Sequence, residues 1–186
     1  MREKTATSGY LAKMVLTALV AAVFCVAGPI SIPIGPIPLS LMTLLLFLSV
    51  YILGYRYALV ACLLYLLLGL AGLPVFTGWQ GGFGKLAGPT GGYLVGYIPM
   101  VAITGIVVAL TEKKKARRVI DALGMIVATA VLYVLGTAWF VVSTGTPVGG
   151  ALLLCVVPFL PGDLIKIVIA VGIGPEISRM LKRVYH

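Results

Sequence analysis

The chain of 186 residues is poor in the side chains that carry most catalytic and metal-binding chemistry. It has one histidine, His186 at the end of the sequence, and only 5 acidic residues. Its three cysteines, Cys25, Cys62 and Cys155, stand alone in apolar runs, without Cys-x-x-Cys or Cys–His spacing. These absences argue against a zinc site and a Cys–His nucleophile, so we expect no bound metal and interpret the cysteines as small buried hydrophobes.

Charge is also scarce, because 61% of the residues are hydrophobic and only 10% are charged. Soluble domains are about a quarter charged, so the excess apolar surface predicts an integral membrane protein. The length suits a single domain, residues 1–186. The net charge of +9 could suggest nucleic acid, but the basic residues form short clusters between long apolar runs. That distribution is typical of loops at a membrane surface, and we expect no nucleic-acid partner.

Motifs for catalysis and for nucleotide binding are missing as well. There is no Gly-x-Ser-x-Gly, and GGFGKLAGPT at 81–90 places a lysine among glycines without the spacing of a phosphate-binding loop. A membrane enzyme is therefore the weaker alternative, and a transporter or carrier the stronger one. We expect no cofactor, and any ATP must be used by partner subunits.

Long apolar segments set the expected architecture, since a membrane-spanning helix needs about 20 residues. They predict an all-α integral membrane protein with six transmembrane helices, at roughly 10–28, 39–54, 57–71, 93–111, 119–143 and 163–182. The first has no cleavage signal behind it, so we interpret it as a spanning helix rather than a signal peptide. The second and third are short, and we expect them to form a tight antiparallel hairpin.

The basic residues predict the orientation of these helices. If the N-terminus is cytoplasmic, the outer segments carry only Lys85. The inner segments then carry Arg2, Lys4, Lys13, Arg56, Lys113, Lys114, Lys115, Arg117, Arg118, Arg179, Lys182 and Arg183. This positive-inside bias predicts a multi-pass protein of the cell membrane with both termini cytoplasmic.

Three irregular segments fall on the predicted outer side. The first, 28–38, has four prolines and no charge, which predicts an extended chain folded back over the mouth of the bundle. The second, 72–92, is rich in glycine, with Phe76, Trp79 and Phe83 interleaved, which favours a packed functional loop over a flexible linker. The third, 144–162, contains an apolar stretch too short to span, which predicts a short helix or re-entrant segment. We expect these outer loops to cap a ligand pocket.

Asp163 and Lys166 are the only acid and base in the apolar run from Ala151 to Val171. A charge at the bilayer centre costs roughly 2.5–3.5 kcal/mol, so such residues pair, face a cavity, or both. Their spacing places them on one face of a helix, and the preceding Pro-Gly break places Asp163 near its N-terminus. They could be a helix cap and its partner, or a binding site. With Gln80 nearby, such a site would suit a small, mostly apolar molecule with a urea- or amide-like head.

The string GLPVFTGWQGGFGKLAGPTGGYLVGY at 72–97 and the string PFLPGDLIKI at 158–167 resemble the BioY family. Proteins of that family are biotin-binding S components of energy-coupling factor (ECF) transporters. The resemblance implies a biotin ligand taken from outside, a transmembrane coupling protein and two ATPase subunits. A transporter for another vitamin, or a carrier that works alone, is the remaining alternative.

The resemblance also implies roles for individual residues. Asp163 and Lys166 match the polar pair that meets the bicyclic head of biotin, and Gln80 supplies an amide. Weaker candidates for contact with the rings and the valeryl chain are Phe76, Trp79, Phe83 and Tyr93. Ala18 and Ala22 match a face of small residues that docks on the coupling protein, although ordinary packing inside the bundle would use the same spacing.

Overall fold

The computed structural model describes residues 2–32 and 37–185, and these form helices and one short hairpin. In chain order the elements are α1 (Arg2–Ala27), β1 (Ser31–Ile32), β2 (Leu39–Ser40), α2 (Met42–Leu53), α3 (Tyr55–Leu70), α4 (Phe83–Ala87), α5 (Gly91–Thr111), α6 (Arg117–Thr144), α7 (Val148–Cys155) and α8 (Leu160–Tyr185). Residues 33–36, which include two of the prolines in 28–38, and His186 lie outside the described residues.

A helix is present at each of the six predicted positions, but some of the helix ends differ from the prediction. The helix expected to begin at residue 39 begins at Met42, because residues 39 and 40 pair as a strand with β1. The short helix α4 inside the glycine-rich segment was not predicted. The helix α7 confirms the short helix expected within 144–162.

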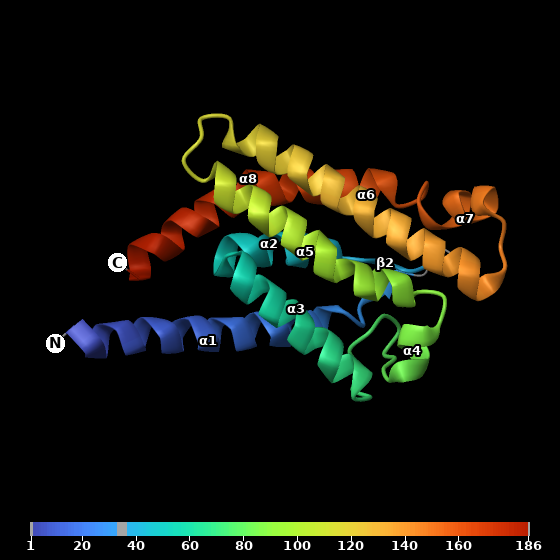
Figure 1. Ribbon diagram of the computed structural model, residues 1–186, viewed down its shortest axis with the longest axis horizontal. Helices are drawn as coiled ribbons and strands as arrows, with labels where there is room; N and C mark the ends of the chain where they lie inside the picture. Colours follow the sequence, from blue (N-terminus) through green and yellow to red (C-terminus); the bar gives the residue numbers. More distant parts are fainter. Residues whose placement is uncertain (1, 33–36, 186) are drawn as a thin grey trace.

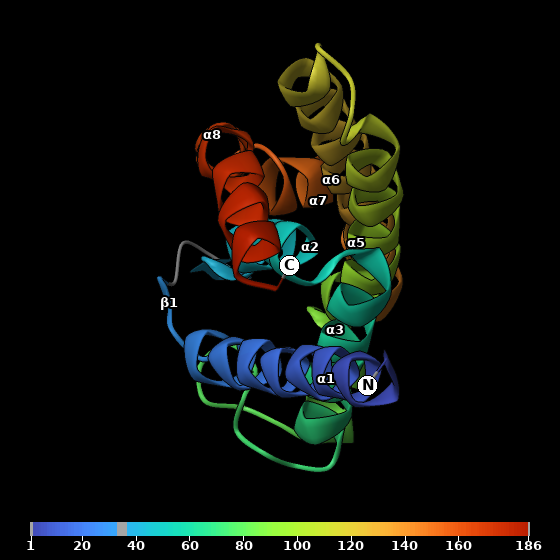
Figure 2. The ribbon, with the colours of Figure 1, turned by 90° about the vertical axis from the view of Figure 1, so that its left-hand side faces the viewer.

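The six longer helices run back and forth along the long axis of the molecule (Figure 1). Both ends of the chain, the α2–α3 turn and the α5–α6 loop lie together at one end, which we call the terminal end. The β-hairpin, α4 and α7 lie towards the other, which we call the loop end. Viewed from the terminal end, α2 lies in the middle, between α8 and α5, while α1 lies at the edge (Figure 2).

Helix lengths and surfaces are those of a membrane protein. Three helices are long and apolar enough to cross a bilayer: Tyr10–Ala27, Gly91–Thr111 and Arg117–Thr144. A fourth crossing results if α7 and α8, bent by 49° at their junction, are counted as one broken span. The remaining apolar helices, α2 and α3, are shorter, with 12 and 16 residues. Large aliphatic side chains cover the outside of the bundle, as expected for a lipid-facing surface.

Glycines allow the close approach of α5 and α6. A Cβ atom on Gly136 would lie 2.4 Å from the ring of Tyr93, and one on Gly92 would lie 2.3 Å from the Cβ of Trp139. In a membrane the hydrophobic effect does not drive helices together, so close packing between them contributes more. Small residues at such positions allow this close packing. The position of Tyr93 therefore depends on the absence of a side chain on α6.

A buried polar cluster fixes the terminal end. Asp121 of α6 is 1% exposed, and it accepts hydrogen bonds from the hydroxyls of Tyr51 on α2, at 2.8 Å, and Thr111 on α5. Arg117 completes the cluster, with its Nε 3.4 Å from the Asp121 carboxylate and its guanidinium over the Tyr51 ring. This carboxylate joins three helices. The sequence interpretation had treated Arg117 only as a basic loop residue and had given Asp121 no role.

We expect Gly136→Ala to lower the thermal unfolding midpoint of the purified protein in detergent. The added methyl group must displace the Tyr93 ring, and overpacking of this kind costs about 1–3 kcal/mol. Gly172→Ala is the matched control, because nothing lies within 4 Å of a Cβ there and alanine favours a helix by about 1 kcal/mol. Equal midpoints for the two variants would contradict the close α5–α6 packing.

Candidate functional site

An ion pair is buried in the loop-end half of the bundle, at the start of α8. The Nζ of Lys166 lies 2.8 Å from Oδ1 of Asp163, and the two residues are 7% and 6% exposed. The helix begins at Leu160, and Pro161 is tolerated in a first turn, where backbone N–H groups have no intrahelical partner. Asp163 in the same turn meets the positive end of the helix dipole.

All three ammonium protons of Lys166 have acceptors. Besides Asp163, Nζ donates to the backbone oxygen of Ser40 in β2, at 2.7 Å, and to the hydroxyl of Thr43 in α2, at 3.0 Å. The Thr43 hydroxyl in turn donates to Oδ1 of Asp163, at 3.2 Å, and the Tyr133 hydroxyl of α6 donates to Oδ2. The pair is therefore fully satisfied inside the bundle, where unpaired charges would be costly.

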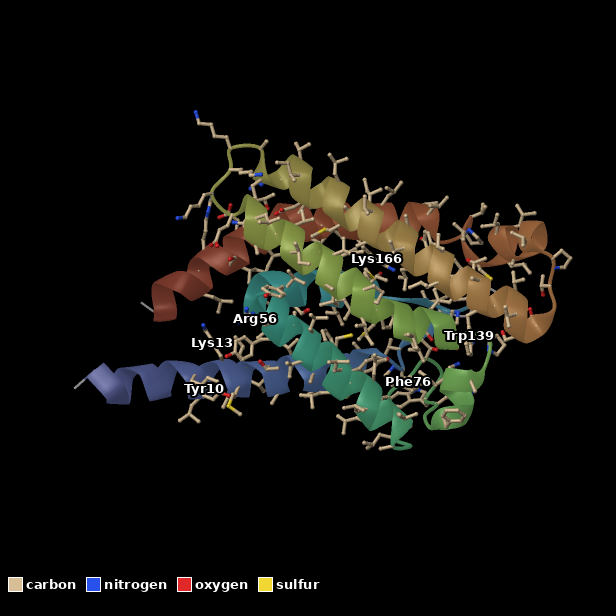
Figure 3. The ribbon with its side chains drawn as sticks, viewed as in Figure 1. Tyr10, Lys13, Arg56, Phe76, Trp139 and Lys166 are labelled. Atoms are coloured by element: carbon tan, nitrogen blue, oxygen red, sulfur yellow. The ribbon has the colours of Figure 1, made fainter. Side chains whose placement is uncertain are left out.

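A small cavity of about 60 Å³ lies beside this pair. Its lining combines the polar cluster with aromatic and aliphatic side chains: Ile37, Pro38, Ser40, Thr43, Tyr93, Tyr97, Leu132, Tyr133, Cys155, Phe159, Asp163 and Lys166. Lys166 lies within the bundle rather than at either end of it (Figure 3). The arrangement offers a carboxylate acceptor and an ammonium donor to a small guest with an apolar body.

The volume of the cavity limits what it holds without movement. One water needs about 10–15 Å³ by this measure, and pockets for drug-sized ligands are about 300–1,000 Å³. A vitamin-sized guest must therefore displace part of the lining. Tyr93 is held by hydrogen bonds with Thr137, at 3.0 Å, and with the backbone oxygen of Cys155, at 3.2 Å. Ile37 and Pro38, on the short segment leading into β2, also line the cavity, and we call these two residues the lid.

Three of the seven predicted ligand residues line this cavity, namely Asp163, Lys166 and Tyr93. The other four belong to the glycine-rich loop and do not line it. Phe76 is fully buried, edge-on against Tyr65 with ring centroids 5.5 Å apart, so it anchors the loop. Gln80 lines a separate hollow, described below, and its backbone pairs with that of Phe76.

Trp79 and Phe83 point outward, with exposed fractions of 68% and 72%. The backbone of Trp79 has a positive φ of 59°, which turns the loop at this residue. The loop is therefore packed as predicted, but through Phe76 alone among the three aromatic residues singled out in it. Contact between Trp79 or Phe83 and a ligand stays a prediction.

Ala18 and Ala22 are both exposed on α1. The buried face of the same helix carries Thr17, Ala21 and Phe24 instead. Packing inside this bundle therefore does not explain the spacing of Ala18 and Ala22, and their contact with a partner stays a prediction.

The sequence interpretation missed Ser40, Thr43, Tyr97 and Tyr133, which complete the lining around the ion pair. For Thr43, Tyr97 and Tyr133 the only local signal was a hydroxyl group in an otherwise apolar helix, which is common in membrane helices, and Ser40 lies in β2. Among the described residues, no group of three or more His, Cys, Asp or Glu side chains could hold a metal ion.

Comparison with known proteins places this arrangement in a family. The sequence pattern of the BioY family matches residues 1–183. The chain is 37% identical to the biotin transporter BioY of Thermotoga maritima, over 90% of this chain and 96% of that protein. It is 36% identical to the biotin transporter BioY2 of Lactococcus lactis, over 92% of each.

A solved structure shares the fold. The crystal structure of the S component for biotin from an ECF-type ABC transporter superposes with a TM-score of 0.81 at 25% sequence identity, covering 91% of this chain and 92% of that one. Sequence pattern, relatives and fold agree over nearly the whole length, and the chain belongs to the BioY family.

Proposed function

We propose that this protein binds biotin and takes part in its uptake as the S component of an ECF-type transporter. The observation that carries the proposal is the buried Asp163–Lys166 pair beside a cavity, in a fold shared with an S component for biotin. The ureido ring of biotin has two N–H donors and one carbonyl acceptor, which are complementary to a carboxylate and an ammonium group.

In the proposed complex Asp163 accepts N–H groups of the ureido ring, and Lys166 donates to its carbonyl. The carbonyl replaces a neutral partner of Lys166, such as the Ser40 backbone oxygen, so the ammonium group keeps three acceptors. Tyr133 holds the carboxylate in place, and Tyr93, Tyr97 and Phe159 pack against the apolar rings. Charge-assisted hydrogen bonds of this kind are about twice as strong as neutral ones.

The proposal includes a topology of six membrane crossings with both termini cytoplasmic, in the cell membrane. In Figure 1 the six longer helices alternate in direction, which supports an even number of crossings. α2, at about 1.5 Å per residue, is shorter than the roughly 30 Å hydrocarbon core. It therefore cannot span the core by itself, and its crossing depends on the helices packed around it. Basic residues gather on the side of the terminal end, as the positive-inside rule requires.

The proposal also includes partner subunits that supply energy. The sequence has no phosphate-binding loop, so any ATP must be used by partner subunits. The likeness to the S component of an ECF-type ABC transporter supports a transmembrane coupling protein and two ATPase subunits as these partners. The exposed Ala18–Ala22 face of α1 is the docking surface that we assign to the coupling protein. Small residues there allow a partner helix to approach closely.

Asp163→Asn tests the ligand site. We expect biotin affinity to fall at least about tenfold, since truncating one partner of a buried charge pair costs about 2–5 kcal/mol. Calorimetry on the purified protein measures this, with Glu176→Gln as the control. Glu176 lies on the same helix, but its side chain is 45% exposed and pairs only with surface arginines. Unchanged affinity in Asp163→Asn would remove Asp163 from the site.

Ala18→Trp tests the docking surface. The indole should block the approach of the coupling protein, so co-purification with the ECF partners should be lost while biotin affinity is kept. Val23→Trp is the matched control, because Val23 is also exposed but lies about 140° around the helix from Ala18. If both variants retain the partners equally, the Ala18–Ala22 face is not the docking surface.

Single cysteines test the orientation. Lys114→Cys, in the α5–α6 loop, should resist a membrane-impermeant maleimide in intact cells, whereas Ser143→Cys, at the far end of α6, should react. Both positions are exposed. The native protein provides the background, because Cys62 and Cys155 are buried and Cys25 is half-buried. The reverse labelling pattern would invert the proposed topology.

A further inference from the structure

Lys85 is the only formal charge in the three irregular segments. The stretches 28–38, 72–92 and 144–162 contain no acidic residue and no other basic one. Lys85 lies on α4 and is half-buried, and no hydrogen bond or ion pair joins its side chain to another described residue. Partial burial lowers the pKa of Lys85 below its usual value. An anion beside it would offset that desolvation.

An open hollow lies beside Lys85. Its volume is about 550 Å³, and it is lined by Gln80, Gly81, Gly84, Lys85, Gly88, Pro89 and Thr90. The lining therefore offers the amide of Gln80 and the hydroxyl of Thr90 beside the positive charge. All of these are potential hydrogen-bond donors, and none carries a negative charge.

Contacts with the helices hold the walls of this hollow. The backbone oxygen of Gly88 accepts a hydrogen bond from the Trp139 indole of α6, at 2.9 Å. The backbone N–H of Gly82 donates to the oxygen of Gly69 at the end of α3, at 2.6 Å. α4 is thus fastened on two sides, and Lys85 has a defined place at the loop end.

The hollow and the cavity are neighbours along α5. Thr90, the residue before α5, lines the hollow, while Tyr93 and Tyr97 of the same helix line the cavity beside Asp163. At about 1.5 Å per residue, these tyrosines lie roughly 4.5 Å and 10 Å further along the helix axis. The hollow that Lys85 lines and the cavity beside Asp163 therefore adjoin the same first two turns of α5.

We propose that Lys85 and its hollow first capture the carboxylate of biotin and so guide the molecule to the cavity. This inference rests on the proposed function. Biotin carries its carboxylate at the end of a flexible chain opposite the ureido ring, so the hollow can attract the carboxylate first while the ring stays free to enter the cavity. In this inference the amide of Gln80 contacts the carboxylate of biotin rather than its ring.

The charge at this end acts alone, so its attraction for an anion is not cancelled by neighbouring acids. Screening limits its range to about 8 Å at physiological salt and extends it to about 30 Å at 0.01 M. A single charge at the rim of a site mainly changes the association rate and its salt dependence. At a separation of about 6 Å in water, the attraction between the ammonium group and a carboxylate raises the encounter rate approximately threefold.

Stopped-flow fluorescence tests the inference on the full-length protein in neutral detergent, which leaves out lipid phosphates. The two tryptophans provide the signal, since Trp79 lies in the glycine-rich loop and Trp139 contacts Gly88. In Lys85→Gln we expect the association rate of biotin at low salt to fall about threefold. The difference from the native protein should vanish at about 1 M salt, with the dissociation rate unchanged.

Two controls separate the possible causes. Lys114→Gln makes the same charge change in the exposed loop at the terminal end and should leave the rate unaltered. Biotin amide, which lacks the carboxylate charge, should associate equally with the native protein and with Lys85→Gln. Equal rates for biotin in both proteins at low salt would overturn the inference while leaving the proposed function intact. Absence of any biotin binding by the native protein would instead overturn the proposed function.

Discussion

Removing a lysine and a carboxylate from water inside an apolar bundle is costly unless every remaining donor and lone pair finds a partner. In this protein the partners of Lys166 and Asp163 come from other elements, because Ser40, Thr43 and Tyr133 belong to β2, α2 and α6. The pair therefore dictates where these three elements lie around the start of α8.

The same arrangement explains how a ligand could enter a site that is already satisfied. The Ser40 backbone oxygen is a neutral partner supplied by the strand that follows Ile37 and Pro38, the two lid residues. A guest carbonyl can take its place at Lys166 without leaving a charge unpaired. In the proposed function, the ligand carbonyl thus replaces the Ser40 backbone oxygen at the ammonium group of Lys166. The cavity widens as the segment that carries Ile37, Pro38 and Ser40 moves away.

Sequence reasoning succeeded where the signal was local. Apolar runs between basic or Pro/Gly-rich stretches predicted the six helices, and the spacing of Asp163 and Lys166 predicted that they share a helix face. It failed where contacts depend on how helices pack. Nothing near Tyr133 or Thr43 in the chain indicates that they meet Asp163, because α6 and α2 reach it only in the folded bundle.

The glycine-rich loop shows the same limit at shorter range. Phe76, Trp79 and Phe83 have similar apolar character, yet Phe76 is buried while the other two are exposed. Trp79 has a positive φ and Phe83 begins the short helix α4, whereas Phe76 packs edge-on against Tyr65 of α3. Composition predicted that this loop is packed, but it could not identify the aromatic residue that packs it.

The two buried acids also divide the bundle into a fixed end and an end that can change. Asp121 joins α2, α5 and α6 near the terminal end through side-chain hydroxyls, and nothing there needs to move for a ligand. At the loop end Ile37 and Pro38 line the cavity and lead into β2, which pairs with β1 over only two residues. Breaking that hairpin removes few hydrogen bonds, whereas opening the Asp121 cluster would leave a buried carboxylate without hydrogen-bond partners. In the proposed function the ligand therefore reaches the cavity from the loop end, where Lys85 lies.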